Sequence, residues 1–520
     1  MLETTFSTAG GTIRVTDAMT LPDGRLAPLR ELARRIEGVS GRVALSWRVE
    51  PRFGYGAARV DFGRRAGVPV ATAGSDALAV LSWEAGEPSI EDGAIGGRFV
   101  ATEGTRSLLA VTAAHGEPLV LPARADVEER IDAAQAFWQE WSSRGSYDGP
   151  WKDAVLRSAL ALKLLFFAPS GAIAAAPTTS LPERIGGERN WDYRYCWVRD
   201  SAFTVDALLE LGGRAEAHAF FWWLLHATQL THPRLHVLYR LDGGAEAEET
   251  TLSLEGHRRS RPVRIGNAAV GQQQLDIYGD LMETAWLYAD RTGMLDADTG
   301  RRLVEIADLV CEIWRQPDSG IWEVRSEPVH FTQSKMMCWV ALDRALRLAE
   351  SGTIPGRNAT RWQNEAEAIR RFVDERCWSE HAGSYVRQAG SEELDASLLV
   401  GVLMGYSAAN DPRLRGTVEA VRRELGRGPL VVRYTAEDGL SAREGAFVTC
   451  SFWLVDALAR VGRLDEAVQT MEQLLSLAND VGLYAEEIDP DTGDFLGNMP
   501  QGLVHLALIG AAGTIGDMTR

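Results

Sequence analysis

The spacing of apolar residues changes once along this chain, and the change limits the folds that the chain can adopt. Up to about residue 120, short apolar runs such as TIRVTDAM, VALSWRVE and RSLLAVTAA alternate with Gly, Pro and Asp. Apolar residues at every second position, bounded by turn residues, predict half-buried antiparallel strands. A series of such strands predicts an antiparallel β-sandwich domain over residues 1–122.

From about residue 126 the spacing becomes helical. Nine segments place apolar residues at positions i, i+3, i+4 and i+7, which predicts helices with one buried face. They are IDAAQAFWQEWSSR, WKDAVLRSALALKLLFF, SAFTVDALLELG, AEAHAFFWWLLHATQL, DLMETAWLYADRTG, LVEIADLVCEIW, SKMMCWVALDRALRLAE, TRWQNEAEAIRRFV and SFWLVDALARVG. Less regular segments bring the number to about a dozen. We expect a linker helix over 123–148 and a mainly α domain over 149–520, in which six helix pairs close into an (α/α)6 toroid.

Four segments between the predicted helices are long and rich in aromatic, glycine and charged residues: 177–198, 232–266, 315–330 and 427–446. Long loops in a compact domain are usually functional or disordered. Their aromatic content argues against disorder. We therefore expect these loops to gather at one end of the toroid and to form a functional site.

Composition excludes several classes of function. A net charge of −18 argues against nucleic acid as a partner, because phosphate binding needs a basic surface. Five scattered cysteines fit neither a disulfide framework nor a metal site, which favours a reducing, cytoplasmic compartment. The N-terminal residues lack a signal-peptide pattern, and we find no run of about 18 apolar residues that predicts a membrane span.

Common cofactor and metal motifs are also missing. The sequence contains no glycine loop ending in GK[ST], no HExxH and no paired CxxC. DPDTGD, from Asp489 to Asp494, resembles a calcium loop but lacks the glycine position and the bidentate acid, so we interpret it as a turn. We expect no cofactor and no bound metal.

Three other segments combine aromatic rings with acidic groups beside a predicted helix. They are RNWDYRYCWVRDSAF (189–203), SGIWEVRSEPVHFTQSKMMCWVALDRAL (319–346) and GLYAEEIDPDTGDFLGNMPQGLVHLALI (482–509). A pyranose stacks its C–H face on aromatic rings, and its hydroxyls take directional hydrogen bonds from charged groups. Hydrolysis of a glycosidic bond also requires two carboxyl groups. Because the chain has 72 acidic residues, only their context can select the two.

The three segments resemble glycoside hydrolase family 15, the glucoamylase and bacterial trehalase-like family. The resemblance extends to about residue 515 and implies a β-sandwich joined to an (α/α)6 catalytic domain. It also implies inverting cleavage of α-glucosides. Bacterial members usually begin upstream of this sequence, so the resemblance implies a sandwich that is incomplete at its N-terminus.

The resemblance assigns roles to individual residues. YCWVRDSA matches the loop that binds the non-reducing glucose in the −1 subsite, which implies sugar contacts for Arg199 and Asp200 and a wall formed by Trp197. IWE matches the motif of the general acid, so Glu323 is the expected proton donor. Desolvation by its neighbour Trp322 can raise the pKa of this acid, as the role requires.

The remaining matches concern the base and the rim. AEEID matches the motif of the general base, with Glu486 as the better match and Glu487 as the fallback. VVRY matches a further sugar-contacting arginine, Arg433. Trp191 and Tyr193 are expected to line or brace the rim of the pocket. PVRIGN resembles a pocket-shaping segment of the bacterial branch, through Arg264 and Asn267.

One departure from the family pattern concerns the leaving-group side of the site. Val324 follows the presumed acid, whereas fungal glucoamylases have a second Glu there that helps to bind the next sugar. The +1 subsite is therefore expected to differ.

Each assignment has a structural alternative. Arg199 and Asp200 can form a buried ion pair that caps the following helix. Glu323 and Glu486 can be exposed loop acids, and Arg433 can fix a loop by hydrogen bonds. Trp222 and Trp223, on a strongly apolar helix, are expected in the core.

The favoured function is inverting, exo-acting hydrolysis that releases glucose from the non-reducing end of short α-gluco-oligosaccharides. The alternative is a trehalase that hydrolyses α,α-trehalose, because the motifs do not separate these two small-molecule substrates. A disaccharide phosphorylase lacks the base carboxylate, so Glu486 argues against it. A non-catalytic glucan-binding protein is the last alternative.

Overall fold

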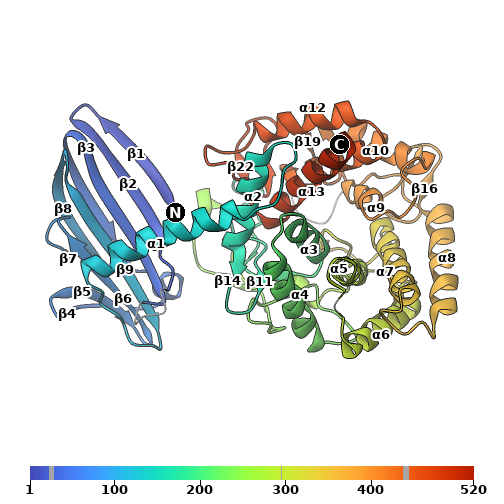
Figure 1. Cartoon of the computed structure of the whole chain (residues 1–520), viewed down its shortest axis with the longest axis horizontal. Helices are drawn as coiled ribbons and strands as arrows, with labels where there is room; N and C mark the ends of the chain where they lie inside the picture. Colours follow the sequence, from blue (N-terminus) through green and yellow to red (C-terminus); the bar gives the residue numbers. More distant parts are fainter. Residues whose placement is uncertain (23–27, 294, 437–443) are drawn as a thin grey trace. The chain divides into compact units, whose positions relative to one another are not determined.

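The computed structural model describes residues 1–22, 28–293, 295–436 and 444–520. It divides the chain into two compact units, Met1–Arg144 and Gly145–Arg520 (Figure 1). Each unit has its own hydrophobic core.

The first unit is the predicted antiparallel β-sandwich domain (Figure 1). Its described strands are β1 (Leu2–Thr8), β2 (Gly11–Met19), β3 (Arg30–Val49), β4 (Asp61–Arg65), β5 (Val68–Ala73), β6 (Asp76–Trp83), β7 (Ser89–Glu91), β8 (Ala94–Thr102) and β9 (Arg106–His115). The order β1-β2-β3-β9-β6-β5-β4 forms the larger sheet, and β8 pairs with both β3 and β7. The 20-residue strand β3 pairs with β9 along its first half and with β8 along its second half.

Strand β3 belongs to both sheets, because it pairs with β9 in one and with β8 in the other. Gly38 lies where the pairing changes, and a Cβ atom there would come within 1.9 Å of the carbonyl oxygen of Thr102. The period-two pattern then places Val43, Leu45 and Trp47 in one apolar cluster, as predicted. The larger sheet forms a second cluster with Val127 and Ile131 of helix α1 (Arg124–Ser143).

Helix α1 belongs to this first unit. Besides its apolar contacts, Arg130 of α1 forms a buried, bidentate ion pair with Glu31 of β3, at 2.9 and 2.7 Å. Bidentate pairing of this kind fixes geometry as well as charge. Part of the segment predicted as a linker helix is therefore packed on the β-sheet.

The second unit is a helical toroid (Figure 1). Its described helices are α2 (Lys152–Leu165), α3 (Ser201–Glu210), α4 (Arg214–Gln229), α5 (Ile277–Thr292), α6 (Ala297–Ile313), α7 (Thr332–Glu350), α8 (Ala359–Arg376), α9 (Leu399–Leu403), α10 (Pro412–Leu425), α11 (Val448–Arg460), α12 (Leu464–Leu475) and α13 (Gly502–Thr519). Helices α3, α5, α7, α9, α11 and α13 each contact the next, and α13 contacts α3. These contacts close the ring that periodicity alone could not prove.

The sequence distinguishes helices of the ring from those outside it. Ring helix α11 buries all of its residues from Val448 to Ala459, whereas the outer helix α12 buries only Ala467, Met471 and Leu474. A helix that is apolar on all sides belongs in a core, and one with a single apolar stripe belongs at a surface. Helix α13 is long and apolar enough to cross a membrane by length and composition, but 72% of it is buried in this unit.

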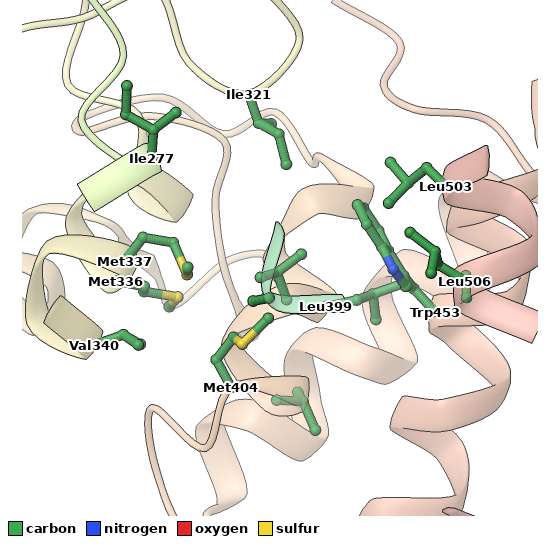
Figure 2. Close-up of a cluster of buried hydrophobic side chains, with 14 of the residues drawn as sticks. Ile277, Ile321, Met336, Met337, Val340, Leu399, Met404, Trp453, Leu503 and Leu506 are labelled. Atoms are coloured by element: carbon green, nitrogen blue, oxygen red, sulfur yellow. The ribbon is translucent and has the colours of Figure 1, made fainter. Parts of the chain in front are cut away.

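The centre of the ring is filled by large side chains rather than open (Figure 2). Figure 2 shows Trp453 of α11 beside Leu503 and Leu506 of α13, with Leu399 close by. The Trp453 ring is 1% exposed and lies 6.2 Å from that of Trp322, centroid to centroid. This core therefore supports the loop that carries the predicted acid. All five cysteines are buried and unbridged.

Candidate active site

A pocket of about 670 Å³ lies within the second unit, where loops from distant parts of the sequence meet. Eight of the residues singled out in the sequence line it: Trp191, Tyr193, Arg199, Asn267, Trp322, Glu323, Arg433 and Glu486. Three of the four aromatic-rich loops, 177–198, 315–330 and 427–446, supply lining residues, whereas the loop 232–266 supplies none, although Asn267, directly after it, reaches the pocket. The C-terminal segment that carries Glu486 is a further contributor.

The segment 193–197 is an extended stretch that carries two aromatic side chains of the site. Backbone N–H groups of Ala176 and Ala175 donate to the carbonyls of Tyr193 and Tyr195, at 3.0 and 2.9 Å. Further along, strand β12 (Cys196–Trp197) pairs with β13 (Leu238–Tyr239). The rings of Tyr193 and Trp197 lie 5.3 Å apart, edge to face. The backbone pairing fixes both rings in position.

Glu323 lies in a tight turn of positive φ after helix α6. Its φ angle is +56°, which an L-residue with a long side chain rarely adopts. Gln272 holds the turn, because its side-chain Nε2 donates to the carbonyls of Glu323 and Val324 at 3.2 and 3.3 Å. Such a backbone is often found at functional sites, where surrounding contacts impose it.

The carboxylate of Glu323 faces the pocket and accepts two hydrogen bonds. Its Oε1 accepts from Nε1 of Trp197 at 2.7 Å and from Nη1 of Arg199 at 3.3 Å. Burial raises the pKa of Glu323, and the nearby Arg199 charge and the Trp197 hydrogen bond lower it in part. The carboxyl group is therefore a weaker acid than an ordinary glutamate.

Glu486 approaches the pocket from the segment that leads into strand β21 (Glu487–Ile488). The side chain is 1% exposed, and its Oε1 accepts a 2.6 Å hydrogen bond from the hydroxyl of Tyr193. Burial raises the pKa of Glu486, while Arg433 and the Tyr193 hydrogen bond lower it in part. Both predicted catalytic carboxyl groups therefore line one pocket, and each is bonded to a residue of the segment 193–197.

Arg433 lies at the edge of the pocket among several carboxylates. Its Nε donates to Glu444 at 2.6 Å, and its Nη2 donates to Glu183 at 3.1 Å. Its guanidinium also lies 5.4 Å from the ring of Trp322. Arg433 therefore fixes its loop, as the structural alternative proposed, and also presents a cation to the pocket.

Three predicted sugar-binding residues do not line the pocket: Trp197, Asp200 and Glu487. Trp197 is 1% exposed, so it forms no wall of the pocket and acts through its hydrogen bond to Glu323. Asp200 pairs with Nε of Arg199 at 2.8 Å, and it makes no side-chain capping bond to helix α3. Glu487 is fully buried, accepts from the backbone N–H of Gly445 at 2.9 Å and lies 3.6 Å from Arg433. Asp200 and Glu487 therefore orient Arg199 and Arg433, the arginines that line the pocket.

Three carboxylates, Glu183, Glu444 and Glu487, have oxygens within 4.8 Å of one another and could hold a cation. Arg433 donates to two of them, and Nη1 of Arg189 lies 3.1 Å from Glu444. The positive charge that this cluster needs is thus already supplied by guanidinium groups.

Trp191 has its own set of partners in the pocket. The guanidinium groups of Arg264 and Arg325 lie 4.6 and 4.5 Å from its ring centroid, and both pair with Glu249, at 3.2 and 2.9 Å. Arg264 also donates to the carbonyls of Glu188 and Asn190, so it shapes the pocket by bracing it, as expected.

The comparison with known families decides the identity of this unit. The family described as "Glycosyl hydrolases family 15" matches residues 149–513. The chain belongs to glycosyl hydrolase family 15. The chain is therefore a glycoside hydrolase, as predicted from its motifs.

Curated relatives within family 15 extend the comparison over almost the whole chain. It is 40% identical over 549 residues to a trehalase of Mycolicibacterium smegmatis, which covers 98% of this chain and 80% of that protein. It is 32% identical over 522 residues to trehalase 1 of Sulfolobus acidocaldarius, covering 98% of this chain and 86% of that protein. The first unit is thus included in both alignments.

A solved structure confirms the fold of this family 15 chain. The crystal structure of a bacterial glucoamylase complexed with acarbose has a TM-score of 0.72 and 14% sequence identity, and the match covers 97% of this chain and 82% of that one. The predicted combination of a β-sandwich with a helical toroid is confirmed.

Several residues that line the pocket were missed in the sequence. They are Glu183, Arg189, Ala269, Gln272, Ile321, Arg325, Phe447 and Gln501. Glu183 and Arg189 lie in the loop 177–198, which its aromatic content marked as functional, and Arg325 lies in the segment quoted for Glu323. The loops were recognisable, but no spacing rule identifies which of their side chains point inward.

Proposed function

We propose that this protein is a trehalase, which hydrolyses α,α-trehalose to two molecules of glucose. The observation that carries the proposal is the 40% identity to a protein named trehalase over 98% of the chain, together with a second such relative of similar coverage. These relatives favour the alternative function over the oligosaccharide hydrolysis that the motifs suggested first.

In the proposed reaction Glu323 is the general acid. It protonates the oxygen between the two glucose units as the bond from that oxygen to C1 breaks. An acid needs a pKa high enough to keep its proton near neutral pH, and the burial of Glu323 works in this direction. Its hydrogen bonds from Trp197 and Arg199 orient the carboxyl group and stabilise the negative charge that remains after transfer.

Glu486 is the proposed general base. It removes a proton from a water molecule, whose oxygen attacks C1 on the face opposite the departing oxygen, so the configuration at C1 inverts. The Tyr193 hydroxyl donates to Glu486 and so favours its ionised form. One water is consumed, Glu486 ends protonated and Glu323 ends ionised, and exchange with solvent restores both.

The glucose that is cleaved at C1 is proposed to bind between the arginines and the rings. Arg199 and Arg433 line the pocket as hydrogen-bond donors, and Trp322 supplies apolar ring surface. Asp200 and Glu487 orient these two arginines rather than contact the sugar themselves.

Hydrolysis of trehalose, maltose and isomaltose, followed by ¹H NMR before mutarotation, tests the proposal. Inverting hydrolysis of α,α-trehalose releases equal amounts of α-glucose and β-glucose, whereas retention releases only α-glucose. Trehalose should give the highest kcat/KM of the three. A preference for maltose would support the oligosaccharide function instead, and phosphate-dependent formation of glucose 1-phosphate would support a phosphorylase.

A further inference from the structure

Building on the trehalase function proposed above, we propose that Arg325 and Trp191 form the binding surface for the leaving glucose of trehalose. Fungal glucoamylases have a second glutamate after the acid, and this chain has Val324 there. The leaving sugar therefore needs other partners, and the structure offers them on the side of the pocket that carries Glu323.

The position of the acid identifies that side. A general acid must lie beside the oxygen that it protonates, so the leaving sugar lies next to Glu323. The chain that continues from Glu323 lines the same wall, with Val324 buried and Arg325 partly exposed. Gln272 fixes this wall through its bonds to the carbonyls of Glu323 and Val324.

Trp191 and Arg325 are held together as one surface. The guanidinium of Arg325 lies 4.5 Å from the Trp191 ring centroid, and its Nη2 donates to Oε2 of Glu249 at 2.9 Å. The other oxygen of Glu249 lies 3.2 Å from Nε of Arg264, a buried arginine that also lies against Trp191. The Glu249 carboxylate thus holds both guanidinium groups against the indole. The surface is therefore already in position before a sugar binds.

The chemistry of this surface suits a second glucose. A guanidinium carries five N–H donors, and the described residues supply Arg325 with a single hydrogen-bond partner, Glu249. The remaining donors can bind hydroxyls of the leaving glucose. The 37% exposed Arg325 side chain and the partly exposed Trp191 both line the pocket. The sugar hydroxyls can accept hydrogen bonds from the guanidinium, and the C–H face of the sugar can stack on the indole ring.

A pair of substrates that differ only in the leaving group tests this proposal. Trehalose has a leaving glucose, and α-D-glucopyranosyl fluoride has none. For R325A we expect the ratio of kcat/KM for trehalose to kcat/KM for the fluoride to fall at least tenfold relative to wild type. R325K, which keeps the charge but loses the planar guanidinium, should lower the ratio less.

The chain offers a matched control for this variant. Arg315 likewise lies 4.3 Å from a tryptophan ring, that of Trp314, and pairs with Glu365 at 2.8 Å, but it does not line the pocket. R315A should leave the substrate ratio at the wild-type value. Thermal unfolding of all three variants establishes that each is folded.

The outcomes separate this proposal from the trehalase function. Wild-type protein that cleaves the fluoride but not trehalose overturns the trehalase function and the leaving-glucose site with it. Wild-type protein that cleaves trehalose, combined with an R325A ratio equal to that of wild type, overturns the leaving-glucose site alone. An equal loss on both substrates also overturns it, because Arg325 then supports the Glu323 loop rather than the sugar.

Discussion

The hydroxyl of Tyr193 lies 2.6 Å from Oε1 of Glu486, a residue 293 positions further along the chain. The Tyr193 ring in turn lies 5.3 Å from Trp197, whose Nε1 donates to Glu323. Two residues of one short extended segment therefore orient both carboxyl groups of the site. The separation of the acid and the base depends on this segment rather than on either carboxylate's own loop.

Removal of the Tyr193 hydroxyl should alter the pH dependence of hydrolysis. In Y193F the ionised form of Glu486 loses a donor, so its pKa rises and the acid limb of kcat/KM moves to higher pH. A hydrogen bond to a charged group contributes about 1.5–3 kcal/mol, which corresponds to about one to two pH units. The pH profile of kcat/KM for trehalose measures the shift.

Tyr484 provides the control for this prediction. Tyr484 lies two residues before Glu486 in the sequence. Its hydroxyl is also buried and donates to the carbonyl of Leu474 at 3.1 Å. Y484F should lower thermal stability without moving the acid limb. If Y193F and Y484F move the limb equally, the effect comes from packing and not from the hydrogen bond to Glu486.

Replacement of the proposed acid should affect substrates according to their leaving groups. E323Q cannot donate a carboxyl proton, so we expect kcat for trehalose to fall by about 10²–10⁴-fold. Fluoride leaves without needing a full proton, so α-D-glucopyranosyl fluoride should lose less activity. Initial rates with both substrates check this. E327Q, which changes an exposed acid of the same loop, should behave as wild type, and an E323Q enzyme with full activity on trehalose would refute the assignment.

The fold could be predicted from the sequence where burial is one-sided. All nine helices predicted from their apolar periodicity exist. The outer helix α8 shows the one-sided burial that the pattern predicts, with Trp362, Ala366, Ile369 and Val373 buried, whereas ring helices such as α11 are buried on all sides. Helix α13 has no stripe, since it is apolar on nearly every side, and α9 has only five residues. Periodicity carries no signal for either. Closure of the ring depends on contacts between α13 and α3, which are far apart in the sequence.

The site could be predicted as a set of motifs but not as a geometry. The motifs brought Glu323, Glu486, Arg199 and Arg433 together in one pocket, as expected. They could not show that Asp200 pairs with Arg199 and does not line the pocket. Neighbouring residues belong to the same motif, but their side chains can point in different directions. A matching motif therefore does not show which of its side chains face the pocket. Arg325 was missed for the same reason.

A buried acid beside the base should make stability depend on pH. Burial raises the pKa of Glu183, and Arg433 offsets this only in part. Because the folded pKa lies above the unfolded value of 4.5, Glu183 contributes stability below that pH, and the contribution is lost as pH rises through the folded pKa. The loss is at most about 1.4 kcal/mol per pH unit.

The variant E183Q mimics the protonated acid and cannot ionise. The free energy of unfolding of E183Q minus that of wild type should therefore increase as pH rises from about 5 to 9, because only the wild type loses stability. Urea unfolding at several pH values measures this difference. A difference that stays constant across the range would show that the pKa of Glu183 is not raised in the folded protein.

The last prediction concerns a glycine that makes room for the base. Gly497 has a φ of +73°, and a Cβ atom there would lie 2.5 Å from Oε2 of Glu486. G497A must therefore displace the carboxylate or the backbone, and we expect kcat for trehalose to fall at least tenfold. Gly493, in the adjoining turn, has nearly the same φ of +76° and open space around its Cβ position.

G493A thus carries the backbone strain of a left-handed alanine, about 1 kcal/mol, without the clash. Both variants should lose similar amounts of stability from this strain, and G497A should lose the activity in addition. Thermal unfolding and initial rates on trehalose separate the two effects. Equal activity in G493A and G497A would mean that Glu486 can move aside without affecting hydrolysis, which is incompatible with its role as the general base.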